Sequence, residues 1–347
     1  MGKINSIAKW KNNIWDMNPS LDEVGRSFSF GEYDWIVNDD GKYEYIIIAN
    51  GSRVEDHSSD FINIKERKLR IDNVLTHYKR KNDNYVIKTF LMDADAPIVE
   101  DAKLFAKYID ILADRDNTSS INIINLSKCG VMGFYVPSFL KSSNSYHKTN
   151  IFNVATPYEG TKLASPLIFY PEVKQFISSK INNENISNVV YNKLIEFYES
   201  ISSNSHMDYD IAIPGGIPND KLKVYDESFI KNVFSSSNIT SINRINSFQN
   251  ILTGIDSNTL KEAISTVNFT GIGLCLLNDI FFEGKSDGMV YIDSQRKVEN
   301  YLDIKSYQLL SAHHDVNSNI RVFNDILSIV DDVIEESKEK GKVKCYK

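Results

Sequence analysis

The amino-acid sequence predicts an α/β protein with a mostly parallel central sheet flanked by helices. Short apolar segments at residues 85–92, 121–126 and 150–155 alternate with segments of helical periodicity. This alternation is typical of parallel sheets, because each parallel connection needs a long crossover. The chain has 347 residues, of which 42% are hydrophobic and 24% charged. A chain of this length buries a large core and needs no disulfide or metal to fold.

The first strands are expected before residue 50. Residues 28–38 (FSFGEYDWIVN) and 43–49 (YEYIIIA) are rich in aromatic and β-branched residues, and an Asp-Gly pair lies between them. Asp-Gly favours the positive φ angles of a tight turn, so the two segments are expected to form a hairpin. Residues 101–112 follow as an amphipathic helix, whose apolar face comprises Leu104, Phe105, Tyr108, Ile109 and Leu112.

Further helices are expected after residue 127. Residues 128–140 are expected to form a helix that Pro137 shortens or kinks. Beyond residue 166 the pattern becomes mostly helical, with segments at 171–204 and 226–265 separated by a loop rich in Gly and Pro.

The sheet pattern returns at 267–277, and residues 319–336 form a last amphipathic helix. The predicted organisation is therefore a sheet domain formed by residues 1–165 and 263–347. A mostly helical insert, residues 166–262, interrupts it. Such an insert commonly covers the carboxyl ends of the strands, where open α/β sheets bind ligands, so it is expected to be a cap or lid.

Charge and cysteine usage limit the classes of partner. The 39 Lys and Arg against 46 Asp and Glu give a net charge of −7, so a nucleic-acid partner is not expected. The sequence lacks the run of about 20 apolar residues that spans a bilayer, so no integral membrane segment is predicted. Cys129, Cys275 and Cys345 have no metal-ligand spacing, so no metal site is expected and a reducing, cytoplasmic location is predicted.

The segment most informative about chemistry is residues 121–134 (INIINLSKCGVMGF). The strand ends before Ser127, and a helix begins with Lys128. A serine on such a sharp turn projects its hydroxyl above the sheet edge. The following backbone N–H groups lie at a helix N-terminus, where negative charge is favoured. A serine nucleophile needs such donors, because its attack on a carbonyl creates an oxyanion.

These residues resemble the nucleophile elbow of the α/β-hydrolase superfamily, Gly-x-Ser-x-Gly, although Asn125 and Cys129 stand in place of the two glycines. The superfamily orders its triad Ser, Asp, His along the chain. Residues 283–290 (EGKSDGMV) resemble the Asp-Gly-Val-Val turn of lipase-like members, which implies Asp287 as the acid. The histidine loop before the last helix implies His313 as the base, with its neighbour His314 as the alternative.

The same resemblance implies an oxyanion hole. Residues 45–52 (YIIIANGS) resemble the strand and His-Gly of the superfamily's oxyanion loop, with Asn50 replacing the histidine. Gly51 would let the backbone approach the substrate. The implied donors are the backbone N–H groups of Lys128 and Ser52.

The resemblance implies a lipase- or esterase-like serine hydrolase that cleaves a small-molecule or lipid ester through an acyl-enzyme, without cofactor or metal. Acyl transfer to an alcohol or amine on the same triad is one alternative. A non-catalytic binding protein on this fold is the other, favoured by the loss of both motif glycines. Aromatic residues of the insert that are candidates for facing an acyl chain are Tyr170, Phe176, Tyr191, Phe197, Tyr198 and Phe229.

Overall fold

The structure is a computed structural model that describes residues 9–12, 30–34, 43–50, 85–91, 97–202, 209–219, 232–255, 261, 285–304, 306–313 and 320–344. The chain divides into two compact units. Unit 1 comprises Met1–Val154, Ser236–Asn250 and Val316–Lys347, and unit 2 comprises Ala155–Ser235 and Ile251–Asp315. Each unit is described by itself below.

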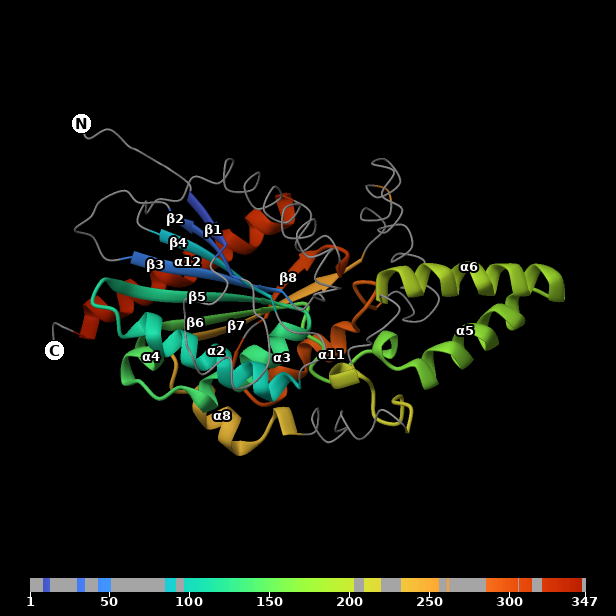
Figure 1. The fold of residues 1–347 in the computed structure, drawn as a ribbon, viewed down its shortest axis with the longest axis horizontal. Helices are drawn as coiled ribbons and strands as arrows, with labels where there is room; N and C mark the ends of the chain where they lie inside the picture. The colour runs from blue at the N-terminus through green and yellow to red at the C-terminus, as the bar shows by residue number, and fades with distance from the viewer. Residues whose placement is uncertain are drawn as a thin grey trace. The chain divides into compact units, whose positions relative to one another are not determined.

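Unit 1 contains a sheet whose central strands are parallel (Figure 1). Its strands are β1 (Lys9–Asn12), β2 (Phe30–Asp34), β3 (Tyr43–Asn50), β4 (Tyr85–Leu91), β5 (Thr118–Leu126) and β6 (Thr149–Val154), together with the start of β7 (Ser247–Gly254). Strands β1 to β6 are ordered β1-β2-β4-β3-β5-β6. β4, β3, β5 and β6 pair in parallel, and β2 pairs antiparallel with both β1 and β4. The predicted α/β class with a mostly parallel sheet is confirmed.

The predicted hairpin between residues 28–38 and 43–49 is wrong. β2 pairs with β1 and β4, whereas β3 lies between β4 and β5. Residues 44–49 of β3 are all buried, so both faces of this strand are covered. Such a strand belongs inside a parallel sheet, and the Asp-Gly signal between the segments does not determine which strands pair.

The helices of unit 1 include three that the sequence predicts, near residues 101–112, 128–140 and 319–336, and one, at 143–148, that it does not. They are α2 (Ile98–Ala113), α3 (Lys128–Tyr135), the 3₁₀ helix η2 (Val136–Phe139), α4 (Ser143–Lys148), α8 (Ser236–Ile242) and α12 (Ile320–Lys344). In Figure 1, α2 and α3 lie below the strands and α12 passes behind them. The predicted apolar faces of α2 and α12 are buried. α3 ends at Tyr135 because Pro137 lies in the following 3₁₀ turn.

A ladder of buried polar side chains crosses the parallel strands. Asn150 on β6 donates to Asn122 Oδ1 on β5 (2.8 Å), and Asn122 donates to Glu44 Oε1 on β3 (3.0 Å). Asn150 Oδ1 in turn accepts from Asn246 Nδ2 (2.7 Å) and Ser247 Oγ (2.8 Å) at the start of β7. Because a buried polar group without a partner is costly, this ladder fixes which residues of neighbouring strands lie side by side.

Unit 2 combines two long helices with shorter elements. These are η3 (Lys162–Ala164), α5 (Pro166–Lys180), α6 (Glu184–Ser202), η4 (Tyr209–Ile211), the end of β7, α11 (Ile292–Arg296), η5 (Lys297–Asn300) and β8 (Tyr307–Leu310). Residues 251–254 of β7 pair in parallel with β8. α5 and α6 are the helices predicted at 171–204, and α5 begins with a proline, as helices often do.

The helix predicted at 226–265 is wrong in its second half. Residues 247–254 form strand β7, and only the short α8 precedes it within the described residues. In the segment SFQNILTG six of the eight residues are buried, the last five of them in succession, which fits a strand covered on both faces better than one buried helical face. The predicted strand at 267–277 lies outside the described residues. The extent of the predicted insert, 166–262, stays a prediction.

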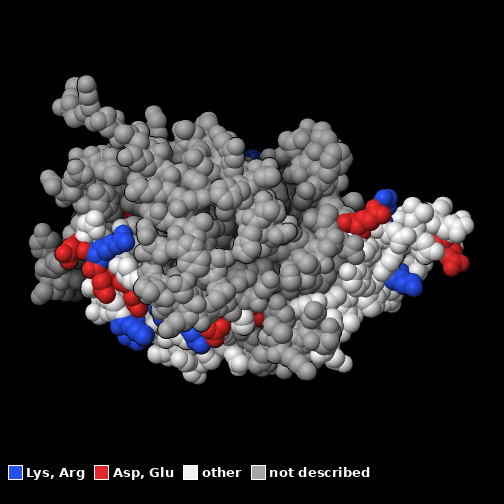
Figure 2. Space-filling view, viewed as in Figure 1, with Lys and Arg blue, Asp and Glu red and all other residues white. Residues whose placement is uncertain are grey.

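Two surface properties bear on partners. Among the described residues, no helix is long and apolar enough to cross a membrane. On the face drawn in Figure 2, Lys and Arg side chains of the described residues are interspersed with Asp and Glu side chains.

Removing the centre of the polar ladder should destabilise the protein. In Asn150→Ala, the buried Oδ1 of Asn122 loses its donor, and Asn246 and Ser247 lose their shared acceptor. We expect the free energy of unfolding in urea to fall by about 3 kcal/mol. The matched control is Asn144→Ala, because Asn144 makes an exposed hydrogen bond to Asp114; its change should stay within about 0.5 kcal/mol. Equal effects of the two substitutions would contradict the prediction.

Candidate active site

Ser127 occupies the sharp turn between β5 and α3. Its backbone has φ 56° and ψ −124°, and it is half-buried. Its N–H donates to Val154 O (2.9 Å), and its carbonyl accepts from the N–H of Gly130 (2.8 Å). Positive φ is strained for a residue with a side chain, by about 1–3 kcal/mol, and such strain clusters at functional sites. The structure therefore places Ser127 at the end of a buried strand in a conformation that only the surrounding hydrogen bonds and packing maintain.

Asn125 fits in place of a motif glycine because another glycine makes room for it. The Asn125 side chain is buried and donates to Asn153 Oδ1 (2.9 Å), and Asn153 donates to Gly130 O in α3 (2.8 Å). A Cβ atom at Gly133 would lie 2.1 Å from Asn125 Nδ2. Helix α3 can therefore lie close to β5 only because position 133 has no side chain. Cys129, in place of the second glycine, is buried in α3 and is not part of a disulfide.

Of the three predicted oxyanion residues, the structure describes one. Lys128 is the first residue of α3, and its side chain is buried. Its backbone N–H belongs to the first turn of the helix, where N–H groups have no partner within the helix. Gly51 and Ser52 lie outside the described residues, as does the alternative base, His314.

Asp287 and His313 form a hydrogen-bonded pair in unit 2. His313 Nδ1 lies 2.8 Å from Asp287 Oδ2, and the backbone N–H of His313 donates to the Asp287 carbonyl (2.9 Å). The side chain of Asp287 is fully buried, and that of His313 is 10% exposed. Because an ionised carboxylate only accepts hydrogen bonds, the pair places a proton on Nδ1 of the neutral imidazole.

Both oxygens of the Asp287 carboxylate accept hydrogen bonds. Oδ1 accepts from the backbone N–H groups of Met289 (3.0 Å) and Val290 (2.8 Å) in a turn whose Gly288 has φ 92°. Oδ2 accepts from Thr253 Oγ1 (2.6 Å) and Gln295 Nε2 (3.3 Å) in addition to His313. These hydrogen bonds take the place of the water molecules that an exposed carboxylate would bind.

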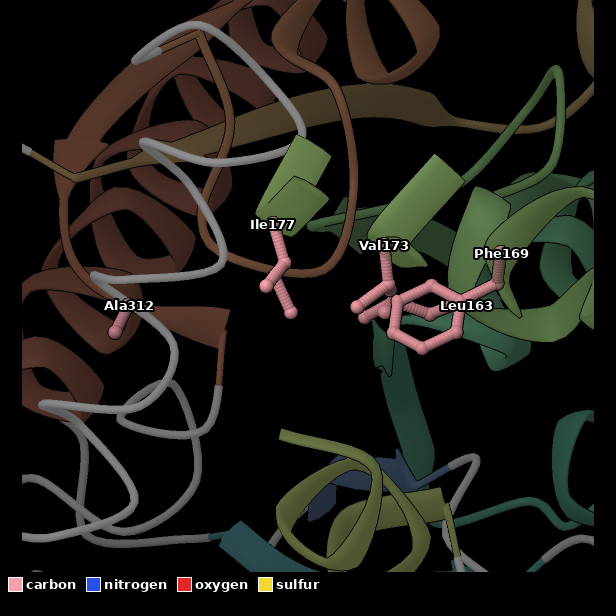
Figure 3. Packing of buried hydrophobic residues seen from close by; sticks show 5 residues of the cluster. All are labelled: Leu163, Phe169, Val173, Ile177 and Ala312. Carbon is pink, nitrogen blue, oxygen red and sulfur yellow. The ribbon is translucent and has the colours of Figure 1, made fainter. Parts of the chain in front are cut away.

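Apolar residues of the two long helices pack beside the histidine loop. The buried cluster comprises Leu163, Phe169, Val173, Ile177 and Ala312, the residue before His313 (Figure 3). Met289, from the turn that holds Asp287, packs against this cluster. So do Tyr170, Phe176 and Tyr191, three of the predicted acyl-facing aromatics. Phe197, Tyr198 and Phe229 lie outside the described side chains.

Two of the predicted triad residues are therefore brought together within one unit. Asp287 and His313 belong to unit 2, and Ser127 belongs to unit 1. Sequence reasoning missed Thr253 and Gln295 as partners of Asp287, because Thr253 lies 34 residues from it along the chain and neither residue belongs to a motif. Among the described residues, no group of three or more His, Cys, Asp or Glu is placed to hold a metal ion.

Comparisons with known proteins show a likeness in fold. No family model matches the chain, and no curated protein matches it. The mature lipase BlEst2 of Bacillus licheniformis is 13% identical, over 86% of this chain and 97% of its own, with a TM-score of 0.49.

Two further solved structures are among those similar to the chain. A peroxisomal α/β-hydrolase of Saccharomyces cerevisiae is 10% identical over 94% of this chain and 88% of its own, with a TM-score of 0.48. An α/β-hydrolase-fold protein of unknown function is 8% identical over 97% of this chain and 98% of its own, with a TM-score of 0.44. Because the sequence identities and TM-scores are this low, the assignment of the α/β class depends on the parallel strand pairing of the chain itself.

The close packing of Asn125 against Gly133 predicts a specific coupling between the two positions. Gly133→Ala should lower the free energy of unfolding by about 2 kcal/mol, because the added methyl group overlaps the buried amide of Asn125. In an Asn125→Ser background the same substitution should cost at least about 1 kcal/mol less. Urea unfolding of the two single variants and the double variant measures this coupling. Strictly additive effects would show that the two positions do not compete for space.

The strained backbone of Ser127 predicts an order of stabilities. Ser127→Gly and Ser127→Ala both remove the hydroxyl, but only glycine adopts the observed φ without strain. We expect the glycine variant to be more stable than the alanine variant by about 1 kcal/mol, after the greater chain entropy of glycine is counted. Thermal unfolding of the two variants tests this. An alanine variant that is equally stable would mean that the turn is not strained.

Proposed function

We propose that the chain is a serine hydrolase that cleaves carboxylic esters, with Ser127 as nucleophile, His313 as base and Asp287 as the acid that orients the base. The observation that carries this proposal is the 2.8 Å hydrogen bond between His313 Nδ1 and Asp287 Oδ2. A buried carboxylate that holds one imidazole nitrogen leaves the other nitrogen to act as a base. The strained turn at Ser127, at the end of a buried strand, supports its role as the nucleophile.

The reaction would proceed in two halves. His313 Nε2 takes the proton of Ser127 Oγ as this oxygen attacks the ester carbonyl, and the carbonyl π electrons move onto its oxygen. When the tetrahedral intermediate collapses, the carbon–oxygen bond to the alcohol breaks and the imidazolium proton passes to the alcohol. Water, deprotonated by His313, then attacks the acyl-enzyme, and Ser127 regains its proton as the carboxylic acid leaves. The proposal requires that Ser127 Oγ and His313 Nε2 come within hydrogen-bond reach.

Backbone N–H groups would stabilise the oxyanion of each tetrahedral intermediate. The N–H of Lys128, in the first turn of α3, is one donor, and the N–H of Ser52, reached past Gly51, is the proposed second. Donors fixed in place by the backbone need no reorganisation as charge develops, and removing one typically costs about 10²–10³ in kcat.

The substrate is proposed to carry an apolar acyl group, as in a small-molecule or lipid ester. Support comes from the residues near the histidine: Ala312 belongs to an apolar cluster with Phe169, Val173 and Ile177 of α5, and Tyr170 and Tyr191 pack against it. An apolar surrounding lowers the local dielectric constant and strengthens the hydrogen bond between Asp287 and His313.

A fluorophosphonate probe tests for an activated serine. The wild-type chain should be labelled and should hydrolyse p-nitrophenyl esters, because the probe reacts only with a serine whose proton is taken by a base. Ser127→Ala should abolish labelling and lower kcat/KM for the ester by at least about 10³-fold. The matched control is Ser143→Ala, which removes an exposed serine of α4 and should keep both signals.

Two outcomes would contradict the proposal. Persistence of labelling in Ser127→Ala would place the nucleophile at another residue. A correctly folded wild-type chain that takes up no probe and hydrolyses no ester would instead favour a non-catalytic binding protein.

A further inference from the structure

Two side chains outside the triad donate to the same oxygen of Asp287 that holds His313. Thr253, near the end of β7, and Gln295, on α11, are both buried. Thr253 Oγ1 lies 2.6 Å from Asp287 Oδ2 and 3.4 Å from Gln295 Oε1. A hydroxyl has one proton to donate, and the shorter distance assigns it to the carboxylate.

The orientation of the Gln295 amide follows from its backbone partners. Its Oε1 accepts from the N–H of Thr253 (2.8 Å), so Nε2 faces the Thr253 carbonyl (3.0 Å). Nε2 also lies 3.3 Å from both Asp287 Oδ2 and the Val290 carbonyl. Gln295 therefore pairs with the backbone of β7 as a neighbouring strand would, while its amide protons are shared with the acid and its turn.

The two oxygens of Asp287 have different kinds of support. Oδ1 is held by backbone N–H groups of Met289 and Val290, which belong to the same turn as the acid. Oδ2 is held by side chains alone: Thr253, Gln295 and His313. Losing the Thr253 hydroxyl would leave the turn intact, but it would release the oxygen that faces the imidazole.

We infer that Thr253 and Gln295 are positioning residues that hold Asp287 Oδ2 against His313 Nδ1, and so fix the orientation and the tautomer of the base. This inference rests on the proposed function, in which His313 is the base. Neither residue touches the substrate. Their effect is on the proton-transfer step, because a base that rotates out of line takes the serine proton less often.

The decisive pair of variants is Thr253→Val and Thr253→Ser. Valine has the same shape as threonine and lacks the hydroxyl, whereas serine keeps it. We expect Thr253→Val to lower kcat for a p-nitrophenyl ester about tenfold, with KM changed less than about twofold, because the lost bond acts on chemistry and not on binding. Thr253→Ser should restore most of kcat.

Proton NMR provides a readout that does not depend on hydrolysis. An imidazole N–H in a short hydrogen bond to a carboxylate gives a resonance far downfield of the amide protons. This signal of His313 should be present in the wild type and in Ser127→Ala, and it should weaken or move upfield in Thr253→Val. Gln295→Glu, which puts a second carboxylate beside Asp287 Oδ2, should change the signal as well.

A control on the same helix separates positioning from general loss of structure. Ser294 Oγ accepts from the N–H of Glu159 (3.0 Å) and donates to Gly160 O (3.2 Å), so its hydroxyl is bonded to the loop at 159–160 and not to the Asp287 carboxylate. Ser294→Ala should lower the temperature of unfolding and leave both kcat and the NMR signal unchanged. Circular dichroism confirms that each variant is folded before it is compared.

The outcomes distinguish this inference from the proposed function. If Thr253→Val keeps both kcat and the downfield signal, the inference is overturned and the threonine is only structural. An equal loss in Thr253→Val and Thr253→Ser would overturn it too, since the hydroxyl would then not be the cause. If the wild type hydrolyses no ester but the signal changes as expected, the positioning of the pair is supported and the proposed function fails.

Discussion

The buried carboxylate of Asp287 sets the local arrangement of unit 2. Moving an ionised carboxylate out of water costs several kcal/mol unless hydrogen bonds replace its hydration. Here five donors do so, and they come from β7, the turn after Asp287, α11 and the histidine loop. Segments far apart in the sequence are thereby fixed around a single group. A further hydrogen bond connects η3 with the same turn, because the hydroxyl of Thr161, the residue before η3, donates to the carbonyl of Met289.

In unit 1 the corresponding constraint is steric. Ser127 is held in a strained turn, and the neighbouring position 125 carries an asparagine where the hydrolase motif has a glycine. The side chain of Asn125 fits because position 133, which faces it from α3, is a glycine: a Cβ atom there would overlap the Asn125 amide. Asn153 then binds both the amide of Asn125 and the carbonyl of Gly130. The departure from the motif is therefore accommodated by packing, which removes a structural objection to a functional turn.

Patterns within one segment were predictable, and pairings between segments were not. The apolar faces of α2 and α12 follow from helical periodicity, and the end of α3 follows from Pro137, because these depend on residues close in sequence. The order β2-β4-β3 depends on which strands bury both faces, and the strand at 247–254 depends on its neighbours in the sheet. The hydrogen bonds of Thr253 and Gln295 to Asp287 were not predicted, because no motif connects either residue with the carboxylate and they form only when β7 and α11 pack together.

The polar ladder of unit 1 has a consequence for biosynthesis. Asn150 on β6 receives hydrogen bonds from Asn246 and Ser247, which are translated only after the whole segment 155–235 of unit 2. Until then Asn150 Oδ1 lacks these two donors and β6 has no β7 beside it, and exposed edge strands favour association with other chains. Long-range pairing of this kind also slows folding. The edge of β6 is therefore completed only by residues that follow it by nearly 100 positions along the chain.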